Sequence, residues 1–226
     1  MCGRFTIAIS VGFFDRFAVP KGDWEPRSRF NVAPSQDIPV ILAESSGNKH
    51  TLTMMHWGLT PSWSKNPSEG HHPINARAET LTERQMFRTL LATRRCLIPA
   101  SGFFEWKTAG KEKIPYYIHR KDDTLFGFAG LYDIWKGDEG PVHSCTIITT
   151  EPNAVIASIH SRMPVILFQE DEDHWLGTEP LDPPSLQKIF TPYPAAPLEA
   201  YRVSKLVNNP GNDSPEVLAP VEGGLM

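Results

Sequence analysis

The sequence has few of the features that mark secreted, membrane-spanning or disulfide-rich proteins. Its 226 residues include only three cysteines, Cys2, Cys96 and Cys145, which have neither paired spacing nor the density of a disulfide framework. No apolar run is long enough to cross a bilayer, and no apolar signal core follows a basic stretch at the start. These absences predict an intracellular protein with free thiols and no membrane partner.

An excess of positive charge is also missing. The formal net charge is -4, so the bulk charge does not favour non-specific attraction to nucleic acid, and any DNA contact must depend on a local basic patch. Metal-ligand spacing is absent too. His71, His72, His143 and Cys145 match neither a zinc ribbon nor a metalloprotease helix, and we therefore expect no metal site.

Proline and glycine are plentiful but dispersed. The 21 prolines and 16 glycines punctuate short elements and form no linker, which predicts a single domain over residues 1–226. Short runs rich in aromatic and β-branched residues, bounded by Gly, Pro or charged turns, predict strands. These runs cover residues 4–9, 38–44, 52–60, 96–106, 115–120, 125–135, 144–150, 163–168 and 200–207.

Helices are expected to be fewer. Apolar residues at helical spacing lie between Thr82, a suitable N-cap, and the basic pair Arg94 and Arg95, and they predict one clear helix. Shorter candidates cover residues 11–17, 153–159 and 185–190. Strands that follow one another without regular intervening helices predict an α+β fold built mainly from antiparallel sheet.

Cys2 is the first candidate for chemistry. A small residue after Met1 permits removal of that methionine, which leaves an α-amine and a thiol on one residue. In model peptides the pKa of the amine is about 8 and that of the thiol is about 8.5, so both groups have a reactive fraction at neutral pH. An aldehyde would form a Schiff base with the amine, and the thiol would then close a thiazolidine ring. Taken alone, a cysteine at this position is more often passive.

Two motifs contain polar side chains suited to a site. INAR at residues 74–77 offers the amide of Asn75 and the planar guanidinium of Arg77, which suits phosphate, although a turn with a solvated arginine is the default interpretation. In GFFEW at residues 102–106, two-residue periodicity places Glu105 on the same face as Phe103. Glu105 is then either a carboxyl with a raised pKa or half of an ion pair.

The motif IHSRMP at residues 159–164 contains a histidine able to titrate near neutral pH. His160 follows a short helical stretch and lies two positions before Arg162, just ahead of an expected strand. Loop residues of this kind often carry function. A histidine at a helix end is more often a cap or a core polar group, and this alternative stays open.

Together these motifs resemble the SOS response-associated peptidase (SRAP) family. The resemblance rests on the order and spacing of MCGRF, FNVAPSQ, WGLTPSW, INARAET, GFFEW and IHSRMP, and it spans nearly the whole chain. The family includes bacterial and eukaryotic proteins that crosslink to abasic sites in single-stranded DNA. It implies a single α+β domain, with antiparallel strands in a barrel-like arrangement, a few peripheral helices and a basic groove that runs to Cys2.

The resemblance also implies roles for particular residues. Met1 is removed, by autoprocessing or by an aminopeptidase, and Cys2 is the nucleophile of both a peptidase activity and a DNA crosslink. Asn75 orients the cysteine, Glu105 manages protons at the amine and the opened sugar, and His160 assists ring opening and crosslink reversal. The implied DNA-binding residues are Arg4, Arg77 and Arg162 at phosphates, and Asn31, Pro34, Trp63, Trp106 and Thr149 along the path of the strand.

The expected function is that of an abasic-site sensor in the DNA damage response. Cys2 would form a covalent thiazolidine with the open-chain aldehyde of an abasic deoxyribose and so shield the lesion, in a lyase-like reaction that needs no metal or organic cofactor. The expected partners are single-stranded DNA with abasic sites and replication or repair proteins. A monomer is expected, cytoplasmic and nucleoid-associated in a bacterium or nuclear in a eukaryote.

Two other functions remain to be weighed. One is a thiol peptidase acting in trans, with Cys2 as nucleophile and His160 as base, but the sequence offers no recognisable specificity pocket. The other is a non-catalytic module that reads modified bases in duplex DNA. In that case Cys2 would be dispensable and binding would not become covalent.

Overall fold

The computed structural model describes residues 2–9, 12–21, 27–44, 50–67, 69–138 and 140–225. In chain order the elements are β1 (Phe5–Ile7), α1 (Phe13–Arg16), β2 (Arg29–Val32), β3 (Asp37–Ala43), β4 (His50–Trp57), β5 (Asn75–Arg77), the 3-10 helix η1 (Ala78–Thr80), α2 (Gln85–Thr93), β6 (Arg95–Ala100), β7 (Gly102–Ala109), β8 (Glu112–Arg120), β9 (Phe126–Gly137), β10 (Gly140–Thr150), α3 (Ala154–Ala157), β11 (Met163–Pro164), α4 (Gln169–Leu176), α5 (Pro183–Phe190), β12 (Leu198–Val203), the 3-10 helices η2 (Lys205–Asn208) and η3 (Pro215–Leu218), and β13 (Pro220–Leu225).

Five strands close into a barrel. They pair in the order β10, β4, β3, β6 and β9, and β9 pairs again with β10 to complete the ring. Every pair in the ring is antiparallel except β10 with β4. The C-terminal part of β10 extends past the ring, where β5 runs parallel to it and β11 runs antiparallel to it. This extension brings β5 and β11 to one edge of the barrel.

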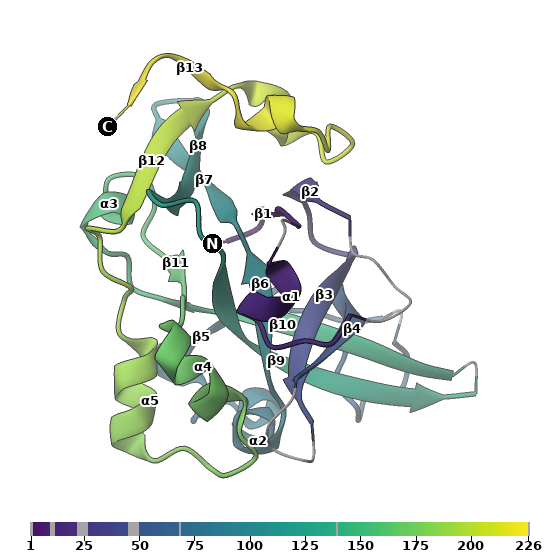
Figure 1. Cartoon of the computed structure of the whole chain (residues 1–226). Coiled ribbons are helices and arrows are strands. Elements are labelled where there is room, and N and C mark those ends of the chain that lie inside the picture. Colours follow the sequence, from purple (N-terminus) through teal and green to yellow (C-terminus); the bar gives the residue numbers. More distant parts are fainter. Residues whose placement is uncertain are drawn as a thin grey trace.

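A second, open sheet lies across one end of the barrel (Figure 1). Its strands are ordered β13, β12, β8, β7, β1 and β2, and each neighbouring pair is antiparallel. Phe5 of β1 joins the two sheets, because its ring packs edge-on against Trp57 and Phe128 of the barrel at centroid distances of 5.1 and 5.9 Å. The main apolar core therefore runs continuously from the barrel into the second sheet.

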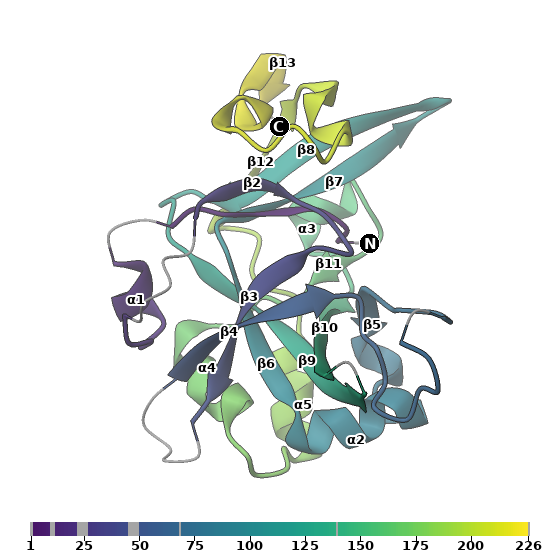
Figure 2. The same cartoon turned by 90° about the vertical axis from the view of Figure 1, so that its right-hand side faces the viewer.

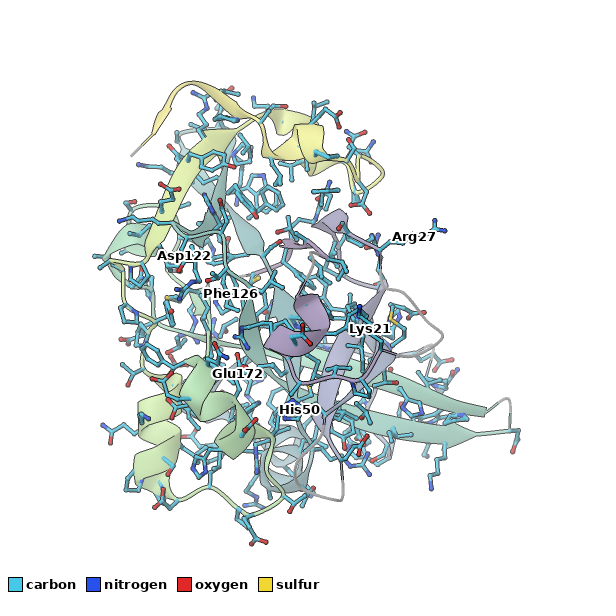
Figure 3. All side chains as sticks on the ribbon, viewed as in Figure 1. Lys21, Arg27, His50, Asp122, Phe126 and Glu172 are labelled. Carbon is cyan, nitrogen blue, oxygen red and sulfur yellow. The ribbon has the colours of Figure 1, made fainter. Side chains whose placement is uncertain are left out.

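The helices α2, α4 and α5 gather at the end of the barrel away from β12 and β13 (Figure 1). Arg16 of α1 binds Glu172 of α4 through two hydrogen bonds of 2.7 Å, and this pair fixes α1 against the barrel wall (Figure 3 labels Glu172). None of the helices in the described ranges has the length and hydropathy that a membrane crossing requires.

The predicted α+β class, with mainly antiparallel strands in a barrel-like arrangement and few helices, is confirmed. The alternation predicted for GFFEW is also present: Phe103 packs in the main core, whereas Phe104 and Trp106 pack in a second apolar cluster around Tyr117. The extent of one domain over residues 1–226 remains a prediction.

The prediction of one strand over residues 96–106 is wrong. The chain breaks at Ser101 into β6 and β7, which belong to the two different sheets. Ser101 is where the chain crosses between them: its backbone N–H donates to Thr6 O at 2.9 Å, and its hydroxyl accepts from Ala8 N at 3.1 Å. A continuous apolar pattern did not reveal this crossing, because both halves are buried.

Several boundaries differ from the prediction. Thr82 is not the N-cap of α2, which begins after Arg84 without a side-chain cap. The strand expected over residues 163–168 shortens to β11. The strand expected over residues 200–207 corresponds to β12, which begins earlier at Leu198 and ends at Val203, just before η2. The helix expected over residues 11–17 shortens to α1, and Val11 lies outside the described residues. The strands β2, β5 and β13 and the helix α4 were not predicted as such.

Gly130 provides a test of the close packing between β9, β6 and β10. A Cβ at this position would lie 2.3 Å from Ile98 Cδ1, 2.9 Å from Cys96 Sγ and 3.0 Å from Thr146 O. Because a backbone oxygen cannot move aside as a side-chain end can, we expect Gly130→Ala to lower the free energy of unfolding by roughly 1–3 kcal/mol in urea denaturation. Gly177→Ala is the control, since its Cβ would meet only ordinary contacts of 3.4 Å or more; equal stability of the two variants would contradict the packing argument.

Candidate active site

Cys2 lies where the two sheets meet. Phe104 N of β7 donates to Arg4 O at 2.9 Å, so the segment that leads into β1 runs beside β7. From the other side, Asn75 Nδ2 of β5 donates to Cys2 O at 2.9 Å. Figure 2 shows the start of the described chain between the β7–β8 hairpin and β5. The Cys2 side chain is 0% exposed.

The position of Asn75 follows from the packing around β5. The buried indole of Trp57 donates through Nε1 to Ile74 O at 2.9 Å, and Ile147 N of β10 donates to the same oxygen at 3.0 Å. These bonds fix the backbone one residue before Asn75 and direct its amide toward Cys2. INAR is therefore a short parallel strand and its asparagine does not form a turn. Asn75 Oδ1 is buried and has no hydrogen-bond partner in the described residues.

Burial changes the acidity of both reactive groups. It raises the pKa of the Cys2 thiol, and the nearby Glu105 carboxylate raises it further. Burial thus disfavours the thiolate in the chain that still carries Met1, and the acidity of the thiol after removal of Met1 stays a prediction. Burial likewise raises the pKa of Glu105, whose side chain on β7 is almost completely enclosed, while the nearby His160 opposes this shift.

His160 approaches Glu105 from the loop after α3. Its Nδ1 lies 3.9 Å from Glu105 Oε1. Asn153 caps α3 by accepting from Val155 N and Ile156 N, and His160 N donates to Ile156 O, so the helix end fixes the histidine. His160 Nδ1 also lies 3.1 Å from Arg162 N and 3.3 Å from Arg162 O, so the backbone of Arg162 holds the ring in place. Cys2, Asn75, Glu105 and His160 therefore come together from four separate segments.

Arg162 is clamped by internal acceptors. Its two terminal nitrogens donate to the two carboxylate oxygens of Glu79 at 2.5 and 2.9 Å, and Nη2 also donates to Thr149 O at 2.5 Å. The hydrogen bonds from Arg162 lower the pKa of Glu79. Thr149 itself is buried on β10. Glu79 was not singled out from the sequence, although it lies within the motif INARAET.

Arg4 and Asn31 are held in a second internal network. Arg4 Nη1 donates to Asn31 Oδ1 at 2.7 Å and to Val207 O at 2.6 Å, and its guanidinium lies 5.9 Å from the ring centroid of Trp106. Asn31 is fully buried and donates through Nδ2 to carbonyl oxygens of residues 207, 209 and 212. Both residues were predicted as DNA contacts, and the structure places their side chains against the segment around η2.

The other predicted DNA-binding residues lie nearer the surface. Arg77 is exposed on β5, two positions from Asn75, and Pro34 lies in the turn between β2 and β3. Trp63 is 71% exposed on the loop between β4 and β5. Among the described residues, neither Pro34 nor Trp63 makes a recorded hydrogen bond or ring contact with the four clustered residues.

A cavity of about 440 Å³ adjoins the cluster. It is lined by Glu105, Trp106, Lys113, His160 and Asn208. Lys113 and Asn208 were not identified from the sequence. Asn208 lies about a hundred positions from Trp106 in the chain, and no local pattern marks its side chain as part of a site.

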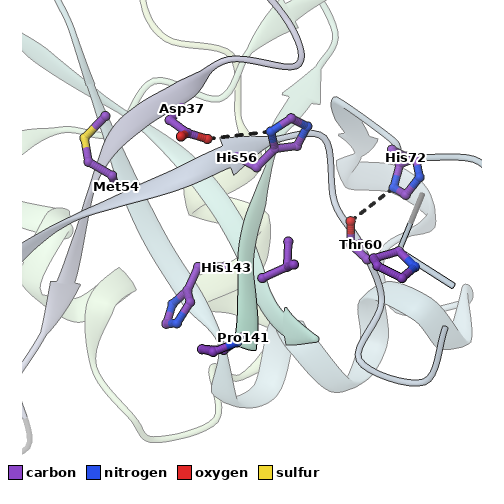
Figure 4. A pocket seen from close by; sticks show the side chains of 9 residues that line it. Asp37, Met54, His56, Thr60, His72, Pro141 and His143 are labelled. Carbon is purple, nitrogen blue, oxygen red and sulfur yellow. Dashed lines mark hydrogen bonds and ion pairs between the residues drawn. The ribbon is translucent and has the colours of Figure 1, made fainter. Parts of the chain in front are cut away.

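A larger cavity of about 710 Å³ lies elsewhere and contains none of the four clustered residues (Figure 4). It gathers three histidines, of which His56 lies 3.6 Å from Asp37 and His72 lies 3.1 Å from Thr60 Oγ1. In the described part of the chain, no group of three or more His, Cys, Asp or Glu side chains is arranged to hold a metal ion.

Comparison with known proteins identifies the family. The profile of the family described as "SOS response associated peptidase (SRAP)" matches residues 1–210. The chain belongs to the SRAP family. It is 48% identical over 226 residues to Abasic site processing protein YoqW of Bacillus subtilis (strain 168), covering 96% of this chain and 99% of that one. It is 30% identical to Abasic site processing protein HMCES of Gallus gallus, covering 88% of this chain and 68% of the relative.

Solved structures support the same fold. A protein from Bacteroides thetaiotaomicron aligns with this SRAP chain at a TM-score of 0.77 and 31% identity, with 85% of each chain covered. A protein from Bordetella bronchiseptica aligns at a TM-score of 0.76 and 23% identity, covering 90% of this chain and 100% of the other, and this likeness concerns the fold alone.

The raised pKa of Glu105 predicts a pH-dependent cost in stability. Below the pKa of the unfolded carboxyl, the group is protonated in both states and contributes nothing. As the pH rises past that value the unfolded state ionises first, so the folded state loses relative stability until the pH exceeds the folded pKa. We therefore expect Glu105→Gln to be more stable than the wild type at pH 7, with the difference shrinking toward pH 4 in urea unfolding.

The control for this measurement is Glu112→Gln. Glu112 is exposed and pairs at 3.3 Å with the equally exposed Lys205, so its removal should change stability little. A Glu105→Gln protein that is less stable than the wild type at neutral pH would show that the ionised carboxylate is stabilised by its surroundings.

Proposed function

We propose that this SRAP protein processes abasic sites in single-stranded DNA through Cys2, after Met1 has been removed. The observation that carries the proposal is the convergence of Cys2, Asn75, Glu105 and His160 beside one small cavity. The printed names of the relatives, abasic site processing proteins, support the substrate. An abasic deoxyribose equilibrates with an open-chain aldehyde, which an amine and a thiol on one residue can capture together.

The first step uses the α-amine of Cys2. Removal of Met1 exposes this amine beside Asn75, whose buried Oδ1 can accept one of its hydrogens. The amine attacks the aldehyde carbon and forms a carbinolamine. Glu105, whose raised pKa favours the protonated form, gives its proton to the departing oxygen, which leaves as water and produces the Schiff base.

The second step uses the thiol. The sulfur of Cys2 attacks the carbon of the protonated Schiff base, and its proton passes to the Glu105 carboxylate that the first step left behind. The carbon–sulfur bond closes the thiazolidine ring and the nitrogen remains as a secondary amine. The reaction joins protein and DNA with the loss of one water, and Glu105 recovers its proton. A carboxyl that both gives and accepts a proton fits a side chain with a raised pKa.

His160 acts on the sugar. Its ring is held through Nδ1 by the backbone of Arg162, and an imidazole can both donate and accept a proton. We assign it to opening of the deoxyribose ring and to reversal of the crosslink, where a proton must reach an oxygen or sulfur that leaves. Arg77, as an exposed cation on β5, suits a DNA phosphate.

The remaining parts of the proposal follow the family resemblance. Seven side chains line or support the path of the DNA strand in this proposal: Arg4, Asn31, Pro34, Trp63, Trp106, Thr149 and Arg162. Autoprocessing of Met1 as a peptidase reaction belongs to the same proposal, as do shielding of the lesion in the DNA damage response, cooperation with replication or repair proteins, and action as a monomer.

A thiol peptidase acting in trans is the weaker candidate. Such an enzyme needs an accessible thiolate, whereas the Cys2 thiol is buried and burial raises its pKa. A protein substrate would also need a binding cleft larger than the small cavity beside Glu105. The geometry therefore favours a small aldehyde over a peptide bond in another protein.

Intact mass spectrometry tests the proposal directly. The active protein should lack Met1, and mixing it with an abasic single-stranded oligonucleotide should add the mass of the oligonucleotide minus one water. Cys2→Ala should form no adduct in the same spectrum while retaining non-covalent DNA binding. An active protein that keeps Met1, or a normal adduct yield in Cys2→Ala, would contradict the mechanism.

The roles of Glu105 and His160 can be separated kinetically. Glu105→Gln should slow formation of the crosslink by on the order of a hundredfold, because it cannot donate or accept the required protons. His160→Ala should slow release at least as strongly as formation. Both rates are measured over a pH series with a trap for free protein. Release at the wild-type rate by His160→Ala at every pH would refute this division of roles.

A further inference from the structure

The cationic side chains discussed so far differ from Lys113 in how many internal partners they already have. Arg4 is bound to Asn31 and Val207, and Arg162 is bound to Glu79 and Thr149. Lys113, by contrast, lines the cavity, is exposed, and forms no ion pair with the residues that the structure describes. Its ammonium can bind an incoming anion without first giving up an internal partner.

Lys113 lies on the same face of the β7–β8 hairpin as Trp106. In the register of the hairpin Trp106 is opposite Pro115 and Thr108 is opposite Lys113, and positions two apart along a strand share a face. Lys113 is therefore a diagonal neighbour of the indole. A flat aromatic surface and a cation beside it can together hold a base and a phosphate of one nucleotide.

The amide of Asn208 is oriented by the same indole. Trp106 Nε1 donates to Asn208 Oδ1 at 2.8 Å. Since an indole N–H can only donate, this bond assigns the oxygen of the amide to Trp106 and leaves Nδ2 with its two hydrogens. Asn208 is exposed and lines the cavity, so it offers donors there. This wall of the cavity thus presents an ammonium and an amide NH₂, a donor set that suits a phosphate.

We propose that Lys113 and Asn208 bind a backbone phosphate of the nucleotide that adjoins the abasic residue, and that this nucleotide packs against Trp106. The inference rests on the proposed function, because the same cavity is lined by Glu105 and His160, which act on the lesion. A phosphate held here, on the β8 side, and another at Arg77, on the β5 side, would direct the strand across Cys2.

The first experiment measures non-covalent binding in a Cys2→Ala background over a series of salt concentrations. Lys113→Gln should weaken binding to single-stranded DNA and reduce the slope of log affinity against log salt by roughly 0.7 to 1. Lys111→Gln is the matched control, since Lys111 lies at the tip of the same hairpin and does not line the cavity. Equal affinity and equal salt slope in the Cys2→Ala protein with and without Lys113→Gln would overturn the proposal.

Asn208→Asp separates DNA binding from a structural role. It keeps an oxygen for Trp106 Nε1 but replaces the NH₂ donors with a second oxygen that repels phosphate, so affinity should fall by about tenfold while the thermal unfolding temperature stays unchanged. Asn208→Ala should weaken DNA binding less, since it adds no repulsion. Wild-type affinity in a folded Asn208→Asp protein would overturn the proposal.

A neutral methylphosphonate linkage placed in turn on either side of the abasic site identifies the phosphate. At one of the two linkages, the loss of affinity caused by the methylphosphonate and the loss caused by Lys113→Gln should not add, because each change removes the same contact. Additive effects at both linkages would overturn the inference.

In parallel, wild-type protein is mixed with an abasic oligonucleotide and formation of the covalent adduct is measured. Absence of a covalent adduct there would refute the proposed function itself. A normal adduct together with unaltered binding in Lys113→Gln and Asn208→Asp would refute only the phosphate site.

Discussion

The hydrogen bond from Asn75 Nδ2 to Cys2 O joins the barrel to the second sheet at the point where the chemistry is proposed. Asn75 belongs to β5, whose position depends on Trp57 and β10, whereas Cys2 precedes β1, which pairs with β7. Glu105 is then fixed beside Cys2 by the register of β1 and β7. The arrangement of the site is therefore a consequence of how the two sheets pack.

The same packing holds two arginines of this chain, which has a net charge of -4, in internal networks beside the site. Arg4 and Arg162 are each bound to backbone oxygens as well as to a side chain, so their guanidinium groups are held in place before any ligand arrives. The internal bonds use part of the hydrogen-bonding capacity of the two guanidinium groups. In return, less side-chain entropy is lost when a ligand binds to them. Arg77 on β5 and Lys113 at the cavity are both exposed.

Local patterns in the sequence predicted the elements better than the site. Aromatic and β-branched runs located most strands, and alternation in GFFEW placed Glu105 and Trp106 on opposite faces. The sequence did not predict the break at Ser101 or the short strand β5, because both depend on partners distant in the chain. The contacts of Arg4 with Val207 and of Arg162 with Glu79 span 203 and 83 positions, and no local pattern specifies them.

The burial of Cys2 bears on the order of the chemical steps. A thiol whose pKa is raised by burial is a poor nucleophile until a neighbouring base is free to take its proton. In the proposed mechanism, loss of water from the carbinolamine consumes the proton of Glu105 and so creates the base that the thiol requires. Attack by the amine must therefore precede closure by sulfur. If the proposed mechanism holds, the enclosed pair of Cys2 and Glu105 favours formation of the ring over reaction of the free thiol with other electrophiles.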